Sequence, residues 1–156
     1  MEPLRQWVCD KCGDLINSAN EGVLQWTDYE AKDHRYYIST GFYIVHNNIN
    51  CSFYKREEPV KDINLSEISG EIGILHMLSF FDKGIFIENQ YPGLRLTNND
   101  IRSLSEIWRR MQIPHYEEAR LYYNEARMDG LLNGENEISM HTQRVLLKMI
   151  KKYRKS

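Results

Sequence analysis

The sequence predicts an α+β protein in which a small antiparallel sheet, held together by a metal, is followed by three or four helices. Cysteine and histidine residues group in the first third of the chain like the ligands of a metal. Runs rich in β-branched and aromatic residues follow the first cysteines, whereas apolar residues recur at helical spacing beyond residue 59. The 156 residues are 42% hydrophobic and 27% charged, which suits one globular domain or two small subdomains.

The strongest motif is a CxxC pair, Cys9 and Cys12, in the segment WVCDKCG, and it is joined further along by His46 and Cys51 in HNNINC. A CxxC turn lets two thiolates face one ion, and a second pair attaches a distant segment to the same ion. Because four protein ligands fill the coordination sphere of zinc, we predict a structural zinc ion at these residues.

Two alternatives to this ligand set remain open. The spacing of the second pair is loose, so His34 is the alternative fourth ligand. The alternative to a metal site is an exposed CxxC pair, with Cys51 buried as a small apolar residue. A redox CxxC motif is disfavoured, because no buried strand leads into a helix around Cys9.

Residues 22–26 and 36–46 have the composition of strands, and we expect them to pair in an antiparallel sheet. Gly41 predicts a bulge or a break in the second run. Residues 28–35 are expected to form a polar connection. The charged segment 55–62, around Pro59, predicts a boundary between a zinc-binding β subdomain, residues 1–58, and a helical subdomain, residues 59–156, packed on it.

Four helical segments are expected after the boundary. The first ends at Gly84, the second is capped by Thr97 or Asn98 and ends before Pro114, the third runs from Pro114 to Gly130, and the last is capped by Ser139. Residues 85–96 read as an extended link. The apolar faces predicted for the first, second and last helices consist respectively of Ile68, Ile72, Leu75, Leu78 and Phe81; of Ile101, Leu104, Ile107, Trp108 and Met111; and of Val145, Leu146, Met149, Ile150 and Tyr153.

The last helix is basic, and this supports an alternative function as a nucleic-acid-associated regulator that binds phosphates through Arg144, Lys148, Lys151 and Lys152. The formal net charge of −2 argues against a surface wholly devoted to nucleic acid. Glu117 and Glu118 also argue against a recognition helix in the third segment, because phosphates would repel them. We expect Arg120 and Arg127 to pair with these two acids or with neighbouring ones.

A small enzyme is the third class considered. The sequence contains no GxSxG, Walker or HExxH motif. His76, His115 and His141 could converge with Glu125 or Asp129, so this alternative predicts a pocket that contains a histidine and carboxylates.

The segment from WVCDKCG to IVHNNINC resembles zinc-ribbon and treble-clef-like modules over about a third of the chain, and this resemblance implies metal binding. The remainder is similar to small bacterial and phage proteins that join a CxxC turn to a helical tail. No apolar run approaches the roughly 20 residues that span a bilayer, and the first residues lack a signal-peptide layout. Together with the cysteine usage, these absences predict a cytoplasmic protein with no membrane contact. The leading functional hypothesis is an adaptor or regulator that binds a protein partner.

Overall fold

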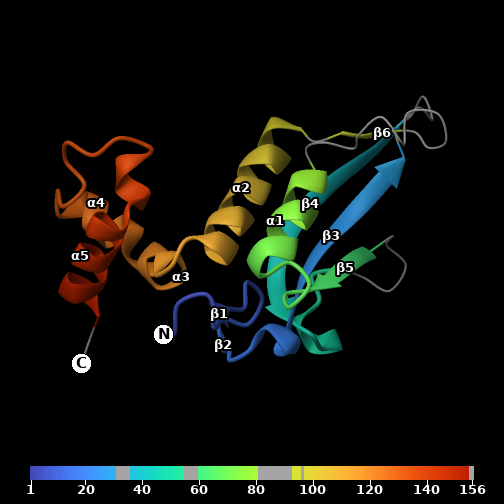
Figure 1. Ribbon diagram of the computed structural model, residues 1–156, viewed down its shortest axis with the longest axis horizontal. Helices are drawn as coiled ribbons and strands as arrows, with labels where there is room; N and C mark the ends of the chain where they lie inside the picture. Colours follow the sequence, from blue (N-terminus) through green and yellow to red (C-terminus); the bar gives the residue numbers. More distant parts are fainter. Residues whose placement is uncertain (31–35, 55–59, 81–92, 96, 155–156) are drawn as a thin grey trace.

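The computed structural model describes residues 1–30, 36–54, 60–80, 93–95 and 97–154, and it has the expected α+β architecture. Figure 1 shows the sheet at one end of the molecule and the C-terminal helices at the other, with a long helix and the N-terminal hairpin between them. Among the described residues, no helix is both long and apolar enough to span a membrane.

The centre of the main sheet is the antiparallel pair β3, Gly22–Glu30, and β4, Tyr36–His46. The prediction that these segments pair is confirmed. The register shifts between Gln25 and Thr27, and at this point Gly41 takes a φ of +71°, which glycine adopts readily. The second run is therefore one bulged strand. The expected connection over residues 28–35 was partly wrong, because β3 continues to Glu30; residues 31–35 lie outside the described residues.

Two short strands complete the sheet in the order β5-β3-β4-β6. β5, Val60–Asn64, runs antiparallel to β3, and β6, Gly93–Arg95, runs parallel to β4. The division at residue 59 stays a prediction, although β5 follows that position and still pairs with a strand that precedes it. The expected extended link ends in β6, and its residues 85–92 lie outside the described residues.

A two-stranded hairpin precedes the sheet. It consists of β1, Trp7–Val8, and β2, Leu15–Ile16, which pair antiparallel around the CxxC turn. Trp7 and Ile16 are almost fully buried. The N-terminal core contains both of them, and its other buried members come from the CxxC turn, β3, β4, the Cys51 turn, the segment before α1, and the helices α1 and α2.

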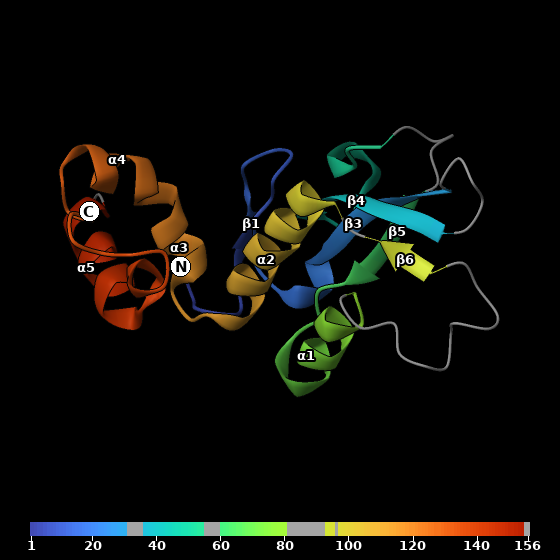
Figure 2. The same ribbon diagram turned by 90° about the horizontal axis from the view of Figure 1, so that it is seen from above.

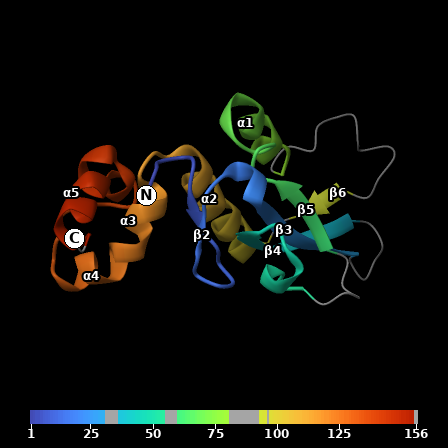
Figure 3. The same cartoon turned by 90° about the horizontal axis from the view of Figure 1, so that it is seen from below.

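The helix α1, Gly70–Ser79, contradicts the predicted apolar face. Ile68 just before it and Met77 within it are buried, as is Gly73, whereas Ile72 is 65% exposed and Leu75 is 64% exposed. Leu78 is also exposed, and Phe81 lies outside the described residues. The 3.6-residue period was present in the sequence, but the helix buries its opposite side, where Met77 joins the N-terminal core. α1 lies at the periphery of the molecule in Figures 2 and 3.

We predict that Gly73→Ala destabilises the protein by about 1 to 3 kcal/mol. A Cβ atom at this position would collide with the backbone of Ile68, which cannot move as a flexible side chain would. Thermal unfolding measures the effect. Ser79→Ala, at an exposed position of the same helix, is the control and should change stability by less than about 0.5 kcal/mol. Equal stability of the two variants would contradict the close approach of Gly73 to the backbone of Ile68.

The longest helix, α2, spans Asn98–Gln112 and packs on β4. Thr97 caps it as expected, and Asp100 completes a capping box. Leu104, Ile107 and Met111 are buried in the N-terminal core, whereas Ile101 is 40% exposed. The helix ends before Pro114, as predicted.

The remaining helices form a second, C-terminal core. The predicted third helix is divided into α3, Tyr116–Ala119, a 3₁₀ turn over Arg120–Tyr122, and α4, Tyr123–Met128, and Gly130 follows with a φ of +70°. The last helix, α5, spans Gln143–Tyr153 and begins later than predicted, because Ser139 opens a separate 3₁₀ turn. Its expected buried face is confirmed, with Tyr153 only partly buried.

Candidate metal centre

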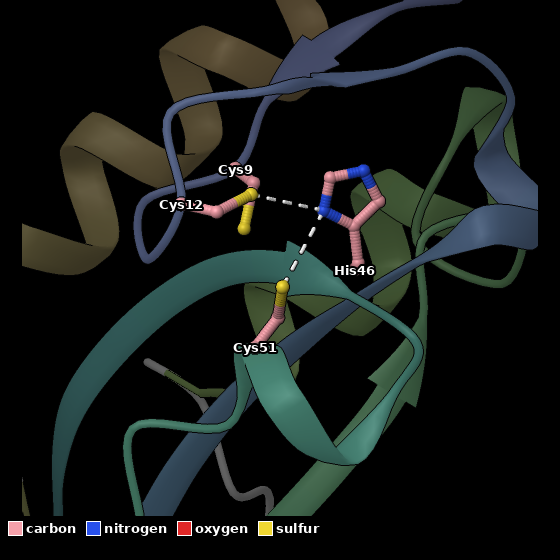
Figure 4. Close-up of side chains that lie close together, drawn as sticks. All are labelled: Cys9, Cys12, His46 and Cys51. Carbon is pink, nitrogen blue, oxygen red and sulfur yellow. Dashed lines mark hydrogen bonds between the residues drawn. The ribbon is translucent and has the colours of Figure 1, made fainter.

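The four predicted ligands come from three separate segments that meet at the end of the sheet. Cys9 and Cys12 lie in the turn between β1 and β2, His46 is the last residue of β4, and Cys51 ends a 3₁₀ turn over Ile49–Cys51. One potential ligand atom from each residue lies within 4.8 Å of the other three. Figure 4 shows the four side chains pointing toward one another.

Backbone hydrogen bonds shape the CxxC turn. The N–H of Cys9 donates to the carbonyl of Asp14 at 2.9 Å, and the N–H of Gly13 donates to the carbonyl of Cys9 at the same distance. Gly13 has a φ of +80°, which favours glycine at this position. The turn closes on itself with both cysteine side chains on its inner side (Figure 4).

The second pair of residues is positioned by the end of β4. His46 lies opposite Gly22 in the sheet register. Two residues later, the side chain of Asn48 accepts hydrogen bonds from the N–H groups of Asn50 and Cys51, at 3.0 and 3.1 Å. This cap turns the chain back, so that Cys51 approaches the histidine that precedes it by five residues.

His46 lies between two sulfurs. Its Nδ1 is 3.5 Å from Sγ of Cys12 and 3.7 Å from Sγ of Cys51, and its Nε2 is 3.4 Å from the carbonyl oxygen of Leu15 (Figure 4). A metal-bound histidine commonly donates its second ring N–H to such a carbonyl, which fixes the orientation of the ring. His34, the alternative ligand, lies outside the described residues.

The thiols of Cys9 and Cys12 differ in acidity. Burial opposes ionisation of Cys9, but hydrogen bonds from the backbone of the turn and from His46 outweigh it and lower the pKa of its thiol to about 6. The Asp14 amide lowers the pKa of Cys12, but desolvation and the neighbouring sulfurs outweigh this and raise it to about 11. The Cys9 thiol therefore ionises readily, and its negative charge disfavours ionisation of Cys12. A bound cation would offset this repulsion and allow the thiols to ionise together.

Next to the CxxC turn lies a buried ion network that the sequence analysis did not foresee. Arg110, 2% exposed, donates to both carboxylate oxygens of Glu117 at 2.7 and 3.0 Å, to Asp10 at 2.7 Å and to the carbonyl of Val8 at 2.8 Å. Arg120 also contacts Asp10 and Glu117. We call these residues, Asp10, Arg110, Glu117 and Arg120, the Arg110 network.

The Arg110 network joins the CxxC turn to the helices. Asp10 lies between the two cysteines and also accepts a hydrogen bond from the N–H of Ile44 at 2.8 Å, while Glu117 accepts one from the N–H of Val8 at 2.9 Å. The expected pairing of Arg120 with Glu117 is confirmed, whereas Glu118 pairs with Arg154 and Arg127 forms no ion pair with a described residue, so the expectation for Arg127 was wrong. Arg110 lies outside the apolar face that the sequence predicts for this helix, and arginine is seldom buried, so the sequence held no signal for its burial.

The basic residues proposed for nucleic-acid binding lie on α5, and two of them pair with acids. Arg144 contacts Glu135 at 2.6 Å, and Lys152 contacts Asp129 at 3.0 Å. Lys148 and Lys151 are exposed. The internal ion pairs reduce the positive field that this helix offers to phosphates.

A cleft with a volume of about 320 Å³ lies between α2 and the C-terminal helices. It brings together His141 and Glu106, whereas His76 and His115 lie elsewhere and Glu125 does not line the cleft. The enzyme alternative predicted a pocket holding a histidine and carboxylates, and this cleft contains His141 with one carboxylate of a different helix.

Comparison of the chain with protein-family models, with curated proteins and with solved structures gives no match in any of the three.

Proposed function

We propose that this protein is a cytoplasmic, zinc-stabilised adaptor or regulator that binds a protein partner through helix α1. The observation that carries the proposal is the exposure of large apolar side chains on this helix. Ile72 and Leu75 are each about two-thirds exposed, and Ile74 and Leu78 are 39% and 44% exposed. An exposed apolar group of this kind is typical of interaction surfaces.

The assignment of zinc is supported by the ligand geometry. Around a tetrahedral zinc ion, with Zn–S of about 2.3 Å and Zn–N of about 2.1 Å, sulfur and nitrogen ligands lie about 3.6 Å apart. The two sulfur-to-Nδ1 distances of 3.5 and 3.7 Å agree with this value. Three thiolates and one imidazole are a ligand set that zinc favours, and they leave no position for a substrate, which supports a structural role. Unpaired thiols at this site also support a reducing compartment.

The chemistry of the partner follows from the surroundings of α1. A groove with a volume of about 580 Å³ lies beside the helix and is lined by Glu67, Glu71, Ile72 and His76, with two serines. Both glutamates are exposed. We infer a partner segment that places apolar side chains on α1 and lysine or arginine side chains opposite the two acids.

The test is a comparison of two matched variants in affinity capture from cell extract. Ile72→Glu/Leu75→Glu should abolish capture of the partner without lowering the melting temperature, because both side chains are already exposed. The control is Met128→Glu/Ile138→Glu, which adds the same charges at positions 86% and 75% exposed and should leave capture unchanged. Equal capture by wild type and the α1 variant would contradict the proposal.

Salt dependence gives an independent reading of the partner's charge. Glu67→Gln/Glu71→Gln should slow association several-fold at low ionic strength, and the difference from wild type should shrink as salt is added. An affinity that does not respond to these substitutions would contradict a basic partner, but it would leave the apolar contact standing.

A further inference from the structure

The cleft between α2 and the C-terminal helices is a separate candidate site, remote in sequence from the metal ligands. Its walls come from α2, from the α3–α4 segment and from the turn that precedes α5. The lining residues are Glu106, Arg109, Tyr116, Tyr123, Asn124, Arg127, Leu132, Met140 and His141. Pockets that bind small molecules commonly lie between two packed units and combine apolar walls with a few polar groups.

The base of the cleft is aromatic and ordered by hydrogen bonds. The rings of Tyr116 and Tyr123 each meet the ring of His141 edge to face, with centroids 5.4 and 5.8 Å apart. The hydroxyl of Tyr123 is 2.8 Å from Nδ1 of His141 and 3.0 Å from the carbonyl oxygen of Met140. The imidazole is thus held in place through Nδ1. Desolvation and the nearby Arg109 lower the pKa of His141, so the ring is neutral at pH 7.

The charge of the cleft is positive by one unit. Glu106 accepts a hydrogen bond from the hydroxyl of Tyr116 at 2.6 Å, and it is 3.5 Å from a guanidinium nitrogen of Arg109. This long contact leaves most of the donors of Arg109 available. Arg127 makes no ion pair within the described part of the chain. Two guanidinium groups and one carboxylate therefore favour a ligand with a single negative charge.

From this geometry we propose that the cleft binds a small carboxylic acid with an aromatic or branched apolar body. The carboxylate pairs with Arg127 and Arg109, for which the planar guanidinium is well suited, while the apolar body lies on Tyr116 and Tyr123. A phosphomonoester fits less well, because Glu106 repels its second negative charge. The volume of about 320 Å³ limits the ligand to a small molecule.

The test uses the zinc-loaded full chain and 3-phenylpropionate as the probe, followed by calorimetry and by NMR shifts of the cleft residues. We expect a dissociation constant of about 1 mM or below. Arg109→Gln/Arg127→Gln should weaken binding at least tenfold. The control Arg102→Gln removes one charge from an exposed position of α2 outside the cleft and should change the affinity less than twofold. No binding below about 10 mM, or equal losses in the two variants, would overturn the proposal.

Two further probes test the charge of the ligand. The neutral analogue 3-phenylpropanol should bind at least tenfold more weakly than 3-phenylpropionate, and phenyl phosphate should bind more weakly than the carboxylate. Glu106→Gln should strengthen binding of phenyl phosphate several-fold more than that of 3-phenylpropionate. If the alcohol binds as well as the acid, the anionic part of the proposal fails. If phenyl phosphate binds more tightly to the wild-type protein, the assignment of a carboxylate fails.

Discussion

Substituting Cys12 by serine is expected to prevent zinc binding and to lower the free energy of unfolding by several kcal/mol. The hairpin of β1 and β2 contains only two residues in each strand, so its own hydrogen bonds contribute little. In small metal sites most of the metal-binding free energy appears as folding free energy, about 10 to 16 kcal/mol for zinc-finger peptides. Elemental analysis of the purified protein and thermal unfolding measure both effects.

The same substitution should cost little in protein treated with a chelator. Cys12 is exposed, so without a metal its sulfur contributes almost no packing. His46→Ala should resemble Cys12→Ser, whereas His34→Ala should retain one zinc per chain and wild-type stability. This pair decides between the two candidate fourth ligands. The zinc assignment is wrong if Cys12→Ser destabilises the protein equally with and without chelator.

Substituting Arg110 by methionine is expected to lower the free energy of unfolding by about 3 to 5 kcal/mol, which is the cost of removing one partner from a buried ion pair. Glu117 is 5% exposed and would lose two of the hydrogen bonds that neutralise it. Urea unfolding is the measurement. Arg144→Met is the matched control, since Arg144 forms an ion pair but is 66% exposed, and its loss should cost no more than about 1 kcal/mol.

Lowering the pH should reproduce part of the loss of stability expected for Arg110→Met. Burial would raise the pKa of Glu117, but Arg110 and Arg120 outweigh it and lower the pKa below the ordinary value of 4.5. The unfolded chain therefore binds a proton first, and the stabilisation from Glu117 is present above about pH 4.5 and is lost as the pH falls through the lower folded value. Glu117→Gln should flatten this region of the stability curve. An unchanged acid limb in this variant would contradict the ionised network.

The Arg110 network also helps to position the CxxC turn of the candidate metal centre. Asp10 lies within the CxxC turn and contacts Arg110 and the N–H of Ile44, so the turn is attached both to the helices and to β4. In Arg110→Met the turn would lose its contact with α2 and should be less well ordered. The two predictions can be separated, because Arg110→Met should retain one zinc per chain whereas Cys12→Ser should not.

Local patterns in the sequence predicted much of the fold and the four residues that gather in the candidate metal centre. Strand composition over 36–46, the glycine at the bulge, Thr97 as a cap and Pro114 after a helix depend on the conformational preferences of single residues, and these act before any tertiary contact forms. The CxxC spacing and Gly13 likewise predicted the turn between β1 and β2, because glycine readily adopts a positive φ. A zinc centre needs particular ligand types, and those types are visible in a sequence.

Which side chains are buried and which are exposed was decided only by the tertiary structure. The apolar period of α1 indicated a helix, yet the fold buries the side with Gly73 and Met77 and leaves Ile72 and Leu75 in solvent. Arg110 and Arg109 are neighbours of the same type, but Arg110 lies in a buried network and Arg109 lines a cleft. The sequence by itself determined where the central strands and the main helices lie and which residues can bind a metal, whereas the short strands, the division of the third helix and the start of the last one emerged only from the fold. Burial depends on which face meets another element, and that is a property of the assembled fold.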